Sequence, residues 1–233
     1  MKKLIKIWIY SLAIMGVFLL LTSSCKKADD NNNPATVTDI DGNVYHTITI
    51  GTQVWLAENL KTTKFNDGSS IPLLTKNAVR TDLTTPEYWW YNNDSAAYDN
   101  PYGKLYNWYA VNDGRDLCPT GWHVPTDAEW TTLTDYLGGL SVAGGKLKET
   151  GFIHWSNGNV GATNESGFTA LPGGDRDING SFNRIGLNGR WWSSSMYGST
   201  GKAWYREMGG NHAGVIQANS SPDDGYSVRC IGD

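Results

Sequence analysis

A run of oxygen-bearing side chains in the second half of the chain has the pattern of a metal-binding loop. Asp175, Asp177 and Asn179 alternate with other residues and Gly180 follows, as at the start of a calcium loop. The closing glutamate is absent, because Gly186 stands at the twelfth position. The same residues between two strands would also form an ordinary hairpin turn. The sequence therefore allows two interpretations. One is a calcium site at Asp175, Asp177 and Asn179, and the other is a hairpin without metal.

The residues typical of hydrolytic enzymes do not form a recognisable catalytic set. The chain has four histidines and one dense serine run, Ser193-Ser194-Ser195, but no Gly-x-Ser-x-Gly element. His123 immediately precedes a predicted helix, where packing or capping is its expected role. Acidic residues are too numerous for a glycosidase pair to be singled out. The sequence names no catalytic residue and favours a protein that is not an enzyme.

Two adjacent pairs of tryptophans, Trp89-Trp90 and Trp191-Trp192, are candidates for sugar contacts. An exposed indole beside polar side chains can stack on a sugar ring. Neighbouring residues of a strand point to opposite sides, so at most one ring of each pair is expected to be exposed. Trp90, Trp191 and the two aspartates of the calcium-like run are the predicted ligand-binding residues. Packing of the rings in the core is the alternative.

The three cysteines are too few for a zinc site built from several thiolates, and none forms a Cys-x-x-Cys pair. Cys25 lies near the N-terminus, which leaves Cys118 and Cys230 in the body of the chain. Two thiols in an oxidising compartment most often pair. Such a bridge would span 112 residues and stabilise the fold by up to about 4–5 kcal/mol in the entropy model. Two buried free thiols are the alternative.

The first 24 residues have the parts of a secretion signal. Lysines at the start precede an apolar run over 7–21, and Thr-Ser-Ser leads to Cys25. The apolar run is shorter than the roughly 20 residues that span a membrane. A cysteine at this place resembles the cleavage site of bacterial lipoproteins, so Cys25 is the predicted lipidation site. An uncleaved membrane anchor is the alternative.

Residues 25–36 are polar and end near Pro34, which predicts a flexible tether. Acidic residues just after Cys25 resemble the surface-export signals of Bacteroidetes lipoproteins, although a plain spacer would look similar. Without residues 1–24 the chain has 16 Lys and Arg against 23 Asp and Glu, a net charge of about −7. This charge argues against nucleic acid as a partner. Residues 37–233 suit one domain.

Two main helices and many short strands must position these side chains. Asn100 suits an N-cap and Pro101 a first helical residue, which predicts a helix starting there. Thr126 and Glu129 have the spacing of a capping box, and the helix that they begin should end at Gly138-Gly139. The order of strands, helices and strands indicates an α+β domain. The other predicted elements are a hairpin at Asp41-Gly42-Asn43, a helical piece over 143–149, and strands at 168–171, 189–194, 203–208, 214–217 and 226–230.

Seven motifs resemble one family, the Fibrobacter succinogenes major paralogous domain, which is abundant in secreted and surface lipoproteins of Bacteroidetes and Fibrobacter. The resemblance covers about residues 37–233, and the family's activity is not well defined. The motifs are Gln53–Leu60, Tyr102–Trp108, Cys118–Thr126, Ala128–Trp130, Ser166–Gly174, Gly189–Ser194 and Tyr226–Cys230.

A second, more distant resemblance concerns the fold. The run from His123 to Trp130 is similar to an element of the sulfatase-modifying, formylglycine-generating proteins. That resemblance implies a C-type-lectin-like fold, with two main helices, short antiparallel strands and long loops. It also implies that a Cys118–Cys230 bridge ties the helical region to the final strand. The catalytic cysteine pair of those enzymes is not carried over, because only Cys230 lies in the corresponding region.

These observations favour a lipid-anchored protein of the outer membrane that faces the periplasm or the cell surface and binds without catalysis. Expected partners are the membrane, through the lipid, and a polysaccharide or another envelope protein. No cofactor is expected apart from the calcium named above. The alternatives are a glycan-acting envelope enzyme and a structural or fimbria-associated envelope subunit.

Overall fold

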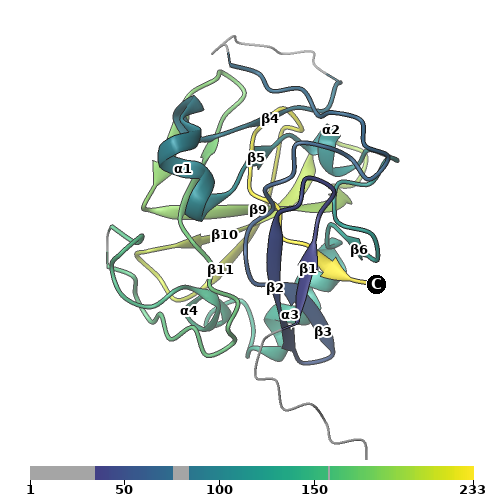
Figure 1. Cartoon of the computed structure of the whole chain (residues 1–233). Helices are drawn as coiled ribbons and strands as arrows, with labels where there is room; N and C mark the ends of the chain where they lie inside the picture. Colours follow the sequence, from purple (N-terminus) through teal and green to yellow (C-terminus); the bar gives the residue numbers. More distant parts are fainter. Residues whose placement is uncertain (1–34, 76–83, 157) are drawn as a thin grey trace, which may run out of the picture. The chain divides into compact units, whose positions relative to one another are not determined.

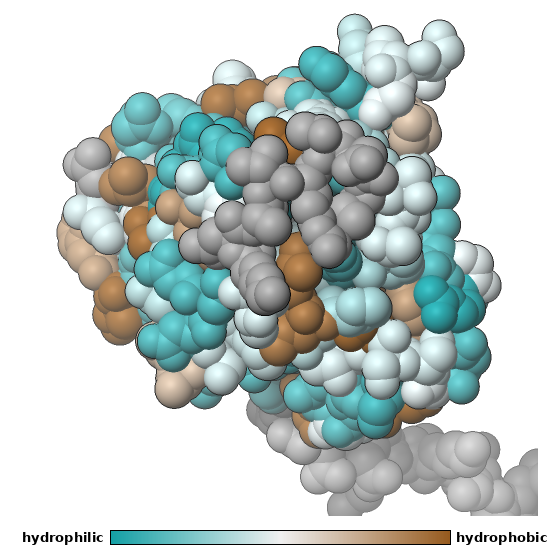
Figure 2. Space-filling view, turned by 90° about the horizontal axis from the view of Figure 1, so that it is seen from above, coloured by the Kyte–Doolittle hydropathy of each residue, from teal (hydrophilic) through white to brown (hydrophobic). Residues whose placement is uncertain are grey.

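The computed structural model describes residues 35–75, 84–156 and 158–233. The predicted signal, Cys25 and nearly all of the predicted tether lie outside the described residues. The described residues belong to one compact unit (Figure 1). On the face seen in Figure 2, hydrophobic residues appear as small groups among hydrophilic ones.

The first sheet begins with the predicted hairpin, which is confirmed. Gly42 takes a φ of +86° and its N–H donates to Asp39 O at 3.0 Å. Glycine adopts this left-handed conformation without strain. All pairs in the sheet are antiparallel. The strands, in spatial order, are β1 (Thr36–Thr38), β2 (Val44–Ile50), β3 (Gln53–Leu56), β12 (Ile231–Gly232) and β6 (Trp122–His123).

The second sheet confirms the strands predicted at 189–194, 203–208 and 214–217. Adjacent residues of its central strands point to opposite sides, and core packs against both faces there. Trp192 and Tyr205 pack into one hydrophobic cluster, and Trp191 and Met208 pack into another. Its strands, in spatial order, are β11 (Val215–Ser220), β10 (Ala203–Gly209), β9 (Asn188–Met196), β7 (Gly173–Arg176) and β8 (Phe182–Ile185). A separate small sheet pairs β4 (Tyr88–Trp89) with β5 (Leu105–Tyr106).

Two predicted strands are instead irregular segments with single bridges. In segment 168–171, Thr169 has a φ of +53°, which interrupts the extended backbone. Segment 226–230 changes partner from residue to residue. Tyr226 pairs with Tyr106, whereas Ser227 N–H donates to Arg190 O. The segment therefore crosses between sheets.

The first helical prediction is wrong in its starting point. Asn100 has an extended conformation (φ −117°, ψ 109°), because the residue before a proline is disfavoured in the helical region. Asp94 caps α1 (Ser95–Tyr102), so the helix starts earlier than predicted. A separate short helix, α2 (Trp108–Val111), is capped by Asn107. A 3₁₀ turn, η1 (Tyr91–Asn93), precedes α1.

The second helical prediction is confirmed. Helix α3 (Asp127–Tyr136) starts with the full capping box of Thr126 and Glu129. Its apolar side places Trp130, Leu133 and Leu137 in the core. The predicted helical piece forms α4 (Ala143–Leu147).

The disulfide predicted between Cys118 and Cys230 is present. Cys230 directly precedes β12, and Cys118 lies four residues before β6. Since β12 pairs with β6, the bridge reinforces a contact that the sheet also makes. The bridge therefore joins segments 112 residues apart at the β12–β6 end of the first sheet.

Candidate functional site

Trp191 cannot serve as a sugar-stacking surface, and its prediction as a ligand contact is wrong. The rings of Trp191 and Trp192 are both 0 % exposed. Trp191 Nε1–H donates to Asn59 Oδ1 at 2.8 Å. Both faces of β9 are covered at this point, so neither Trp191 nor Trp192 reaches the solvent.

Trp90 keeps part of its ring at the surface, whereas the neighbouring Trp89 is buried. The expected alternation therefore holds for this pair. Trp90 Nε1–H donates to Asp99 Oδ1 at 2.9 Å, and Lys104 Nζ lies 5.3 Å from the ring centroid. The ring is thus held in place by polar and cationic neighbours.

The calcium-like run forms the hairpin between β7 and β8. Asp175 lies on β7, next to the turn, and is 1 % exposed. Both of its oxygens accept from Arg184 Nη1 at 2.9 Å. Burial raises the pKa of Asp175, and Arg190 and Arg184 oppose that shift.

The other two residues of the run support the turn. Asp177 Oδ1 and Asn179 Oδ1 both accept from the N–H of Ser181 at 3.0 Å. Within the described residues, no group of three or more His, Cys, Asp or Glu side chains could hold a metal ion. Calcium at this hairpin would have to replace Arg184 as the partner of Asp175.

Asp175 belongs to a charge network that extends across the second sheet. Arg190 Nη1 lies 3.7 Å from Asp175, and Arg190 Nε donates to Glu207 Oε2 at 2.5 Å. Asn188 Nδ2 donates to the other Glu207 oxygen at 2.8 Å. The Glu207 carboxylate is therefore fixed between an amide and a guanidinium.

Glu207 lies at the edge of a cleft of about 270 Å³ at one end of β9, β10 and β11. Polar groups that can bind hydroxyls lie beside two partly exposed aliphatic side chains, Leu187 and Ile216. Sugars present hydroxyls at their edges and C–H groups on their faces, so both kinds of contact suit a sugar. The polar lining residues are Asn188, Glu207, Asn211 and His212.

The sequence did not single out these polar residues. The strand pattern at 203–208 put residues 205 and 207 on one face, but the pattern alone could not show that a loop leaves the end of this face open. Lys148 helps to shape that opening from inside the protein. Its buried ammonium donates to Val160 O at 3.0 Å, Gly209 O at 2.9 Å and His212 O at 2.8 Å.

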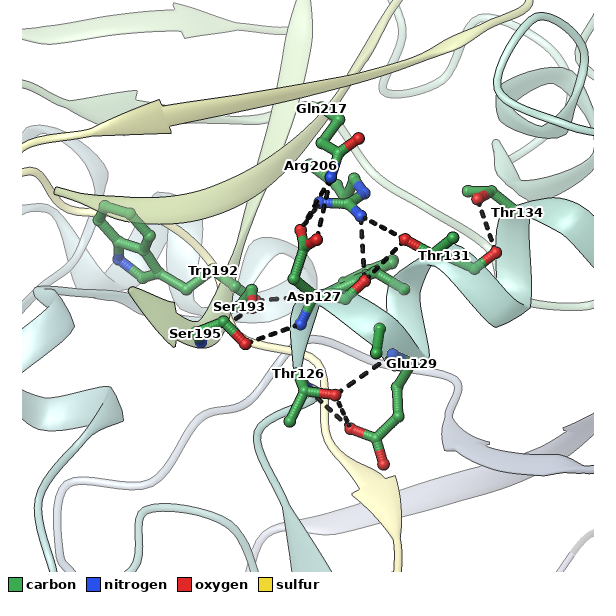
Figure 3. Close-up of polar contacts among 12 residues, drawn as sticks. Thr126, Asp127, Glu129, Thr131, Thr134, Trp192, Ser193, Ser195, Arg206 and Gln217 are labelled. Carbon is green, nitrogen blue, oxygen red and sulfur yellow. Dashed lines mark hydrogen bonds and ion pairs between the residues drawn. The ribbon is translucent and has the colours of Figure 1, made fainter. Parts of the chain in front are cut away.

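The serine run and helix α3 form a separate structural network (Figure 3). Asp127 accepts from Arg206 Nη1 at 2.6 Å and from Gln217 Nε2 at 3.0 Å. The Asp127 N–H donates to Ser195 Oγ at 3.0 Å. Arg206 is 0 % exposed, so this network fixes the start of α3 on the second sheet.

His123 ties the first sheet to α3 and has the supporting role that was expected. Its Nδ1 lies 2.6 Å from Asp233 Oδ1 and its Nε2 lies 2.9 Å from Glu129 Oε1. Among the hydrogen bonds of residues 35–75, 84–156 and 158–233, none joins a histidine to Ser193, Ser194 or Ser195.

Several of the motifs that carry the family resemblance meet at one buried amide. Asn59 Oδ1 accepts from Trp191 and from Arg229 Nη2, the latter at 3.0 Å. Asn59 Nδ2 donates to Tyr102 O at 2.9 Å. Residues from four separate motifs thus form one node of the core.

A family model described as the Fibrobacter succinogenes major domain matches residues 48–232. Comparison with curated proteins and with solved structures gives no match. In the part of the chain that the structure describes, no helix is long and apolar enough to cross a membrane.

Proposed function

The chain belongs to the Fibrobacter succinogenes major domain family, and from this premise we propose that it is a non-catalytic binding module for glycans. In this proposal a lipid on Cys25 anchors the protein to the outer membrane, and residues 25–36 form the tether. A C-type-lectin-like domain then faces the periplasm or the cell surface.

The cleft at Glu207 carries the glycan part of the proposal. A carboxylate held by Asn188 and Arg190 keeps free lone pairs for the hydroxyls of a ligand. Leu187 and Ile216, each 43 % exposed, offer apolar contact to the face of a sugar ring. Fixed polar groups beside apolar surface are typical of small-ligand sites.

The affinity of a single such site would be low. A few hydrogen bonds and a small apolar contact support a dissociation constant near the millimolar range. Many anchored copies on one membrane would raise the effective affinity through multivalency. A membrane anchor that holds many copies together would therefore compensate for the low affinity of each site.

The test is a glycan array probed with the protein displayed on beads in many copies. We expect binding to a subset of polysaccharides. Asn211→Ala removes one hydrogen-bonding side chain from the rim and should weaken that binding roughly fivefold, which corresponds to about 1 kcal/mol. Asn219→Ala, on β11 but outside the cleft, is the matched control.

Trp90→Ala belongs in the same assay. Of the four tryptophans in the two adjacent pairs, Trp90 alone is partly exposed. Lower binding at an unchanged melting temperature would make it a second contact. If no glycan binds, or if Asn211→Ala and Asn219→Ala behave alike, the cleft is not a glycan site.

A further inference from the structure

A second cleft, of about 260 Å³, lies beside the buried node at Asn59. Arg229 and Asn59 line it from the core, and Lys61 and His46 line it nearer the solvent. Leu171 and Pro101 add apolar surface. None of its lining residues belongs to the cleft at Glu207.

Arg229 is a buried cation that has only neutral hydrogen-bond partners. The side chain is 1 % exposed and its guanidinium lies 4.2 Å from the ring centroid of Phe168. It donates to Asn59 Oδ1 from Nε and Nη2, and to Leu56 O and Phe168 O from Nη1. Of its five N–H groups, one on Nη2 has no acceptor among the described residues.

Among the described residues that line the cleft, the one acidic residue, Glu58, is already paired with His46. Glu58 Oε1 lies 2.6 Å from His46 Nδ1, and Glu58 Oε2 accepts from the His46 N–H at 2.8 Å. Arg229 and Lys61 therefore leave the cleft with a positive balance, although the whole chain has a net charge of −4. Burial lowers the pKa of Arg229 to about 9, and Glu58 offsets only part of that effect.

We propose that this cleft is a second binding site, which takes the carboxylate of an organic acid about the size of a monosaccharide. The carboxylate would accept from the remaining N–H of Arg229 and from the ammonium of Lys61. Leu171 and Pro101 would contact the body of the ligand. An anion here supplies a hydrogen-bonded counter-charge, which Arg229 does not have among its described partners.

The probe is D-glucuronate, compared with D-glucose, which has the same ring but no charge. Calorimetric titration of the full chain, purified from the envelope in detergent, should show binding of glucuronate and much weaker binding of glucose. Lys61→Gln should weaken glucuronate binding roughly fivefold, as expected for the loss of one partly exposed charge partner. Lys202→Gln removes an exposed lysine outside the cleft and should leave binding unchanged.

Glucuronate should also raise the melting temperature of the parent protein more than that of Lys61→Gln. Asn211→Ala, in the other cleft, should bind glucuronate normally, so this proposal and the proposed glycan site can fail independently. Absence of glucuronate binding, equal binding of glucose, or equal effects of Lys61→Gln and Lys202→Gln would overturn the assignment.

Discussion

His123 is the residue whose ionisation should be most visible in the stability of the fold. Burial opposes its protonation, but hydrogen bonds to Asp233 and Glu129 outweigh burial and raise the pKa of His123 above 6.5. The charged form therefore stabilises the folded state. This contribution is fully present below pH 6.5 and is lost as the pH rises through the raised pKa.

We expect the melting temperature to fall as the pH is raised from 6 through the raised pKa of His123, by an amount that corresponds to at most about 1 kcal/mol because the pairs are partly exposed. His123→Gln should remove this dependence. His46→Gln is the matched control, because His46 also pairs with a carboxylate at the surface. Equal pH profiles for the parent and His123→Gln would exclude this role.

At the scale of secondary structure, α3 is attached to the second sheet through Asp127. Removing this carboxylate leaves the buried Arg206 without its charged partner. Loss of one member of a buried ion pair costs about 3–5 kcal/mol, and the 23 % exposure of Asp127 places the expected loss at the lower end.

Chemical denaturation should therefore show Asp127→Ala destabilised by about 3 kcal/mol. Asp135→Ala, at an exposed position of the same helix, should change stability by less than about 0.5 kcal/mol. If both variants unfold at the same denaturant concentration, the network in Figure 3 does not hold the helix.

The elements that sequence predicts well are those with local signals. The capping box fixes α3, the Asp-Gly-Asn turn fixes the first hairpin, and alternation marks β9 to β11. The sequence pattern misplaces the start of α1, because Pro101 suits a first helical residue but also makes Asn100 extended. A proline thus favours a helix that starts at its own position and disfavours the helical conformation in the residue before it, and the sequence alone does not show which effect decides the boundary.

The candidate sites were less predictable, because they depend on contacts distant in sequence. Asp175 looked like a cation ligand, but its partners Arg184 and Arg190 come from other strands. Trp191 is a candidate surface ring by sequence, but the two hydrophobic clusters that cover β9 on its two faces are built from residues distant in sequence. The cleft at Glu207 needs a loop, a turn and three strands, and no local pattern describes that combination.

At the scale of the whole protein, the proposed membrane attachment depends on Cys25, which is outside the described residues. Cys25→Ala should leave a precursor that lipoprotein signal peptidase does not process, and the protein should leave the detergent phase in phase partition. Lys26→Ala, next to the cysteine, should be processed and partition normally. Normal processing of Cys25→Ala would exclude the lipid anchor.

The position of β12 has a consequence for how the protein is made. This strand lies between β3 and β6, yet it follows every other element in the chain. A polypeptide that emerges with its N-terminus first presents β3 and β6 as open strand edges, and such edges favour intermolecular pairing. During synthesis there is thus an interval in which β3 and β6 have emerged, but β12, the strand that joins them in the first sheet, has not. A deletion of β12 (Ile231–Gly232) should preserve that vulnerable form and make the product a target for quality-control proteases.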